Sequence, residues 1–196
     1  MKSLAILIAL ITLSIPALAE KNCQFRFDLE NSVVEGTGFK FTKKTGVTGK
    51  FPKFTLNNED AKKEIKDLLK GLIVTVDTMT VETNNNLRDQ NLREAFFSVL
   101  ADNAEAKVEV KKVLDKKIEA LVHLNGQSKP VSFTYKVGKD SIEAEGSIDA
   151  MDFAMTDAMA SLVKRCGSLH TDKDGKSKTW SDFKLHVKAA LKKVCS

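Results

Sequence analysis

The sequence predicts a mainly β fold of eight or nine antiparallel strands, with two or three short helices between them. Apolar and polar residues alternate with period two in many short runs, for example around Val108 and around Val122, which is typical of half-buried strands. Turn residues such as Asn125-Gly126 separate these runs and indicate successive hairpins. From the residues alone two architectures remain open, a β-sandwich and a closed barrel.

The first residues have the pattern of a secretory signal peptide. Lys2 is followed by an apolar run over residues 4–15 and by a small-x-small motif that ends at Ala19. That run is too short to span a bilayer as a helix. We therefore expect a signal peptide at residues 1–19, export from the cytoplasm, and a single domain at residues 20–196.

The N-terminal third alternates strands with turns. Alternating residues predict a strand that starts near Cys23 and continues past Phe39, and Gly46 with Gly49 predicts the turn after it. Pro52 marks a strand end or a bulge. A helix is expected before Gly71, which would end it. A change in the phase of the apolar residues near Asp77 predicts a bulge in the next strand.

The segment from Val76 to Phe97 predicts a strand, an Asn-rich turn and an amphipathic helix that ends near Leu100. After it, alternation predicts strands near residues 105–111, 117–124, 131–137 and 142–148. Residues 153–163 predict a helix, and a last strand follows the polar loop around Gly175. No repeat and no second domain is apparent.

Charge and motifs argue against several function classes. The net charge is +5, but lysines alternate with glutamates along the predicted strands, which indicates a solvated face rather than a nucleic-acid site. The three histidines are far apart and have no metal-ligand spacing. No nucleophile elbow and no phosphate-binding loop is present. We therefore expect neither an enzyme nor a metal site.

The chain has three cysteines, so at least one thiol remains unpaired. Three pairings are open to the sequence. If the first and last strands are neighbours in an antiparallel barrel, Cys23 lies beside Cys195. That arrangement favours a disulfide between these two residues and leaves Cys166 as a free, buried thiol.

One motif resembles the signature of the YceI-like family. It has the pattern T-x-N-x-x-x-R-D-x-x-L-x-x-x-F-F, carried here by Thr83, Asn84, Arg88, Asp89, Leu92, Phe96 and Phe97. A second pattern, G-x-x-G-x-F at residues 46–51, also resembles the family. The resemblance implies an elongated, lipocalin-like barrel with a lipid-sized tunnel in the bacterial periplasm. The stretch from Lys164 to Trp180 lies outside the signature, and we expect it to reshape the mouth of the barrel.

The resemblance further implies a periplasmic lipid-binding protein that carries or sequesters a long-chain amphiphile, such as a polyisoprenoid or an isoprenoid quinone. It implies no cofactor other than a bound isoprenoid lipid, no nucleic-acid partner and no stable membrane insertion, and a homodimer is compatible with it. The candidate ligand-binding residues, at the barrel lining and mouth, are Phe39, Phe41, Phe51, Phe54, Met79, Val81, Arg88, Leu92, Phe96, Phe97, Phe133, Tyr135 and Phe153.

Two alternatives stay open at this point. Side chains can fill a small barrel, so the phenylalanines fit a packed core as well as a tunnel. A filled barrel would serve as a stress-protective or protein-interaction module without a ligand. Arg88 likewise has two roles open to it, because it can tie the strand-to-helix turn to nearby carbonyls or meet the polar head of a ligand.

Overall fold

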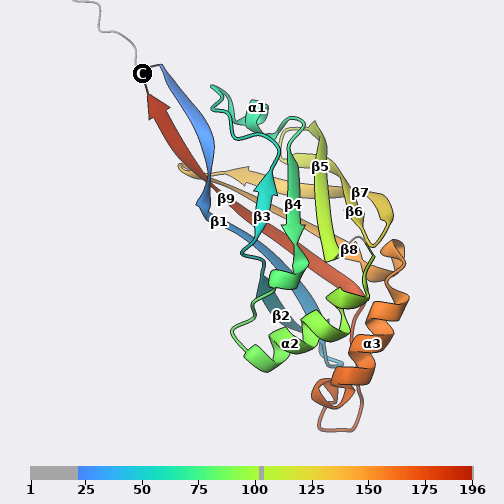
Figure 1. Cartoon of the computed structure of the whole chain (residues 1–196). Helices are drawn as coiled ribbons and strands as arrows, with labels where there is room; N and C mark the ends of the chain where they lie inside the picture. Colours follow the sequence, from blue (N-terminus) through green and yellow to red (C-terminus); the bar gives the residue numbers. More distant parts are fainter. Residues whose placement is uncertain (1–21, 102–103, 196) are drawn as a thin grey trace, which may run out of the picture.

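One antiparallel sheet forms most of the computed structural model, which describes residues 22–101 and 104–195. The order of its nine strands is β2-β1-β9-β8-β7-β6-β5-β4-β3 (Figure 1). The signal peptide expected at residues 1–19 lies outside the described residues. The strands are β1 (Cys23–Lys40), β2 (Thr45–Lys50), β3 (Phe54–Leu56), β4 (Ile73–Asp77), β5 (Glu105–Val113), β6 (Lys117–Leu124), β7 (Gln127–Val137), β8 (Ser141–Asp149) and β9 (Asp182–Cys195).

Three short α-helices accompany the sheet. Figure 1 shows α2 and α3 together at one end, whereas α1 lies near the other end, where the described chain begins and finishes. Short 3-10 turns extend or precede them. The helices and turns are α1 (Ile65–Leu69), η1 (Thr78–Thr80), α2 (Asn86–Ala95), η2 (Phe97–Val99), η4 (Ala150–Phe153), α3 (Thr156–Cys166) and η5 (Gly167–His170).

The first and last strands pair along most of their length. Their register starts with Cys23 opposite Cys195, and a disulfide joins these two residues. The predicted pairing is therefore confirmed, and Cys166 is a free, buried thiol. The register of β1 against β9 shifts between Asp28 and Val33, and the second half of β1 pairs with β9 on one side and with β2 on the other.

The predicted mainly β class, the antiparallel strands and the short helices are confirmed. The sheet is a curled half-barrel rather than a closed barrel, because among the described residues its edge strands β2 and β3 do not pair with each other. The edge of β2 instead makes one bridge to the segment after β4, where the backbones of Lys50 and Glu82 exchange hydrogen bonds of 2.8 and 2.9 Å.

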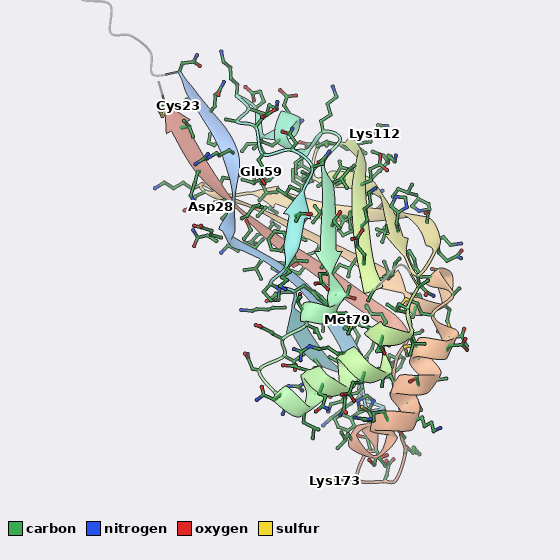
Figure 2. All side chains as sticks on the ribbon, viewed as in Figure 1. Cys23, Asp28, Glu59, Met79, Lys112 and Lys173 are labelled. Carbon is green, nitrogen blue, oxygen red and sulfur yellow. A yellow bond between two sulfur atoms is a disulfide. The ribbon has the colours of Figure 1, made fainter. Side chains whose placement is uncertain are left out.

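The period-two pattern places the core on the inner face of the sheet. Along β6, Ile118, Ala120, Val122 and Leu124 are buried, and the residues between them are more exposed. The bulge expected near Asp77 is instead a strand end. There the Asp77 carboxylate accepts a hydrogen bond from the backbone of Met79 and starts η1. The chain then turns toward α2, as the position of Met79 in Figure 2 shows.

Candidate functional site

Two adjoining cavities lie between the sheet and the helices that cover one end of it. The larger, here called the inner cavity, has a volume of about 210 Å³ and is lined by residues of every strand except β2. The smaller, here called the rim cavity, has a volume of about 130 Å³. Its lining comes from the ends of β1 and β2, from α2 and α3, and from the segment between α3 and β9.

The lining of the inner cavity is apolar except for three side chains that already have partners within the protein. Ser32 donates to the carbonyl of Asp28, and Thr78 donates to the carbonyl of Ala104. The Glu35 carboxylate lies 3.1 Å from Nδ1 of His186. A guest in this cavity therefore meets hydrocarbon surface.

The rim cavity is polar on one side. Its polar lining comprises Lys40, Thr83, Arg88, Asn91, His170 and Thr179, and it also includes the ring of Trp180 and the thiol of Cys166. None of the described residues that line it is an aspartate or a glutamate. The cavity therefore combines an apolar wall with a cationic rim.

Two groups in the rim cavity have shifted pKa values. Burial raises the pKa of the Cys166 thiol, and the nearby positive charges of Arg165 and Lys40 offset part of that increase. Burial lowers the pKa of His170, and the charge of Lys40 lowers it further. Lys40, Cys166 and His170 line the same cavity, so the charge of Lys40 is close to both groups.

The turn into α2 holds Arg88 in place. Asn85 caps the helix by accepting a hydrogen bond of 2.9 Å from the backbone of Arg88. Asp89 is buried and accepts bonds from both the backbone and the hydroxyl of Thr83. Arg88 donates from Nε to the Thr83 hydroxyl at 2.8 Å and from Nη2 to the Thr83 carbonyl at 3.0 Å. Arg88 thus ties the turn to a carbonyl and also borders the rim cavity.

Four phenylalanines line both cavities and form the boundary between them. They are Phe51, Phe96, Phe97 and Phe183. The ring centroids lie 5.9 Å apart for Phe51 and Phe97, 5.1 Å for Phe96 and Phe97, and 5.8 Å for Phe96 and Phe183. We call this group the phenylalanine partition. Among the described residues, only these four and Gly36 line both cavities.

Most of the predicted ligand-binding residues border one cavity or both. Phe54 and Phe133 line the inner cavity, and Phe51, Phe96 and Phe97 line both. Four residues lie at the rim cavity, namely Phe39, Val81, Arg88 and Leu92. Whether they contact a ligand remains a prediction.

Four predicted residues line neither cavity. Phe41 lies in the turn after β1 with a φ of 63°, and its carbonyl accepts the indole N–H of Trp180. Met79 lies in η1, where its carbonyl accepts a bond from Arg93. The hydroxyl of Tyr135 donates to the carbonyl of Leu114.

The fourth, Phe153, is 1% exposed and packs within the core. Phe41, Met79 and Phe153 lie in turns that directly follow a strand, whereas Tyr135 lies within β7.

The prediction did not assign several rim residues to the site. Lys40, Cys166, His170, Thr179 and Trp180 reach the cavity because the segment after α3 folds back against the end of β1. Backbone hydrogen bonds join residues 39 and 180, and also 41 and 178, at 3.0 and 2.9 Å. The sequence analysis expected residues 164–180 to reshape the mouth because they lie outside the family signature, but it assigned none of their side chains to the site.

Phe183, Leu185, Val187 and Ala189 on β9 also line the inner cavity. Their alternation was readable from the sequence, but their role was not. Residues 22–101 and 104–195 contain no cluster of His, Cys, Asp and Glu suited to a metal ion. The same residues form no helix with the length and apolar character that crossing a membrane requires.

A family model of the YceI-like domain matches residues 25–188. The chain belongs to the YceI-like family. The matched range includes every residue that lines the two cavities except Ala189, and Cys23 and Cys195 also lie outside it. A UPF0312 protein of Serratia proteamaculans is 32% identical over 117 residues, which are 53% of this chain and 58% of that protein. The match thus spans less than two thirds of that relative's length.

Solved structures show the YceI-like fold at low identity. A polyisoprenoid-binding domain from Saccharophagus degradans has a TM-score of 0.58 and 13% identity, with 86% of this chain and 97% of that chain covered. BcnA of Burkholderia cenocepacia has a TM-score of 0.57 and 12% identity, with coverage of 85% and 99%. At these identities the likeness establishes the fold alone.

Proposed function

We propose that this YceI-like protein binds a long-chain amphiphile of the polyisoprenoid or isoprenoid-quinone kind and carries or sequesters it without chemical conversion. The observation that carries the proposal is the inner cavity, whose few polar side chains are all engaged within the protein. Hydrocarbon buried there gains roughly 25 cal/mol per Å² of surface removed from water. The name of the Saccharophagus degradans domain supports this ligand class.

The size of the cavities sets how such a ligand would lie. An engineered cavity of about 150 Å³ in another protein admits benzene, and the inner cavity of about 210 Å³ is only moderately larger. A long chain therefore has to continue past the phenylalanine partition into the rim cavity. We expect the rings of Phe51 and Phe97 to move apart when a chain binds.

The same volumes favour a second candidate function. Pockets for drug-sized ligands commonly measure about 300–1,000 Å³, and each cavity here is smaller. A barrel that stays filled would act as a stress-protective or protein-interaction module without a ligand. Export to the bacterial periplasm is part of both proposals. It is supported by the signal peptide expected from the sequence and by the Cys23–Cys195 disulfide, which fits an oxidising compartment.

The first test is native mass spectrometry of protein purified from the periplasm, followed by extraction and identification of the released molecule. We expect a stoichiometric acyl or prenyl chain. A bare mass, together with no uptake from a lipid mixture, would favour the filled barrel.

A matched pair of variants on β9 locates the ligand. Ala189 lines the inner cavity, whereas its neighbour Ala190 does not, and both are half-buried. Ala189→Phe should place a ring in the cavity and reduce lipid occupancy at least fivefold, whereas Ala190→Phe should leave it near the wild-type level. Circular dichroism confirms that both variants are folded. Equal occupancy in the two variants would show that the tail binds elsewhere.

A further inference from the structure

Two cationic side chains, Lys40 and Arg88, are among the described residues that line the rim cavity. None of the ion pairs between described residues includes Arg88 or Lys40. The bonds that Arg88 donates to Thr83 use Nε and Nη2, and a guanidinium has five N–H donors. Donors of Arg88 therefore remain for a guest in the cavity that this side chain borders.

Further cations surround the mouth. The ammonium of Lys44 lies 4.8 Å and that of Lys178 lies 5.0 Å from the centre of the Trp180 ring, which lines the cavity. Two acidic residues on neighbouring segments have partners of their own, and neither lines the cavity. Asp182 pairs with Lys44 at 2.7 Å, and Asp172 accepts two bonds from Thr42.

Asp89 accepts its two bonds from Thr83 and does not line the rim cavity. The charged side chains that do line it among the described residues, Lys40 and Arg88, are both cationic. The charge on the lining of the inner cavity has the opposite sign. No lysine, arginine or histidine lines it, and its one charged lining residue is the glutamate paired with His186.

We propose that the rim cavity binds the anionic head, a carboxylate or a phosphate, of the amphiphile whose tail occupies the inner cavity. This rests on the proposed function and narrows its ligand, because a quinone head is uncharged whereas the head proposed here is a carboxylate or a phosphate. It also adds the direction of binding. Charge-assisted hydrogen bonds from Arg88 and Lys40 hold the head, because a guanidinium and an ammonium both favour such oxygens. The tail then passes between the rings of the phenylalanine partition.

The protein contains its own reporters for this site. Trp180 is the only tryptophan in the chain and lines the rim cavity, so its fluorescence responds to a bound head. Cys166 is the only free thiol and lines the same cavity. A bound head therefore also slows alkylation of Cys166.

The test compares three ligands with the same chain, namely hexadecanoate, hexadecyl phosphate and hexadecanol, by titration of Trp180 fluorescence on delipidated protein. Because hydrogen bonds to a charged group are worth about a factor of ten or more in affinity, we expect the two anions to bind at least tenfold more tightly than the alcohol. Inorganic phosphate and acetate, titrated alone, should not reach comparable affinity at millimolar concentration.

Variants assign the effect to the rim. Lys40→Gln should weaken binding of the two anions about fivefold to tenfold and leave hexadecanol unchanged, whereas Lys139→Gln, in an exposed turn far along the chain, should change neither. Arg88→Lys keeps the positive charge at the strand-to-helix turn and removes the planar set of guanidinium donors. We expect it to weaken binding of the anions by less than Lys40→Gln does. Thermal unfolding of each variant shows that it is folded.

The outcomes separate the two proposals. Equal affinity for all three amphiphiles, or an equal loss with Lys40→Gln and Lys139→Gln, would overturn the anionic head and leave lipid binding in place. Inorganic phosphate that binds as tightly as hexadecyl phosphate would make the rim a site for a free anion instead. Failure of all three amphiphiles to bind would overturn lipid binding and the head site together.

Discussion

The inner cavity and the rim cavity share four phenylalanine rings, yet they differ in the elements that line them and in the polarity of their lining. Strands with strict alternation line the inner cavity, so its surface is apolar and its exceptions are hydrogen-bonded. Helix ends and a folded-back loop line much of the rim cavity, where polar and cationic groups gather. A sheet supplies a uniform surface because every second side chain points the same way. Loops at its end supply a mixed surface.

This difference predicts the response to a buried charge, which is the largest effect we expect. Val108 lines the inner cavity and Val47 lines the rim cavity, and both are half-buried strand residues. Val108→Asp should lower the free energy of unfolding by about 3 kcal/mol or more, because the carboxylate has no partner there. Val47→Asp should cost about 1 kcal/mol. Urea denaturation measures both.

The asparagine variants at the same two positions are the control, since they keep the shape and remove the charge. The difference in unfolding free energy between the aspartate and the asparagine variant should be large at residue 108 and small at residue 47. Similar gaps at the two positions would mean that the cavities do not differ in polarity as described.

Two glycines test how tightly side chains pack at the two cavities. A Cβ at Gly146 would lie 2.6 Å from the ring of Phe133 at the inner cavity, and one at Gly49 would lie 2.8 Å from Val81 at the rim cavity. Each alanine variant should lose about 1–3 kcal/mol of stability, because a packed side chain has to move. Calorimetry measures the loss.

Gly167→Ala serves as the control for these variants. No atom lies within 4 Å of a Cβ at that position, and its φ is −52°. The substitution should be neutral, or stabilising by about 0.5 kcal/mol. A loss as large as that of Gly146→Ala would indicate that contact with Phe133 is not the cause of the loss at residue 146.

The alkylation rate of Cys166 tests whether the rim cavity is closed to solvent. The thiolate is the reactive form, and burial raises the pKa of this thiol above its ordinary value of 9.0. Alkylation by iodoacetamide at pH 8 should therefore be about tenfold slower in the folded protein than in urea, and it should keep accelerating above pH 9. Because the unfolded chain releases this proton first, stability should also fall as the pH rises past 9. Equal rates in folded and unfolded protein would show an open site.

The smallest effect we expect is the pH dependence of stability that His170 contributes. Its pKa is lowered from 6.5, by burial first and by Lys40 second. As the pH falls below 6.5 the unfolded chain binds this proton before the folded one, so stability should decrease slightly. NMR titration of Lys40→Gln should show the pKa of His170 moving up toward 6.5. An unchanged value would place the charge of Lys40 away from the cavity.

Alternation and one motif made much of the inner site predictable. The inward phase of the predicted strands put Phe133 on the cavity side, and the double phenylalanine in the family motif put Phe96 and Phe97 at its boundary. The same logic failed at Phe41, which shares the phase of Phe39 but lies in a turn with positive φ. It failed again at Met79, where a capped 3-10 turn replaces the expected strand.

By itself, the sequence determined the β class, the inward-facing residues and the motif that shapes the turn into α2, because these depend on periodicity and on contacts within a few residues. Tertiary structure alone decided that the sheet stays an open half-barrel and that the rim is cationic. The contact between Thr42 and Asp172 and that between Phe41 and Trp180 join residues more than a hundred positions apart. No local pattern encodes such pairings, since they form only when the curled sheet brings its end and the loop after α3 together.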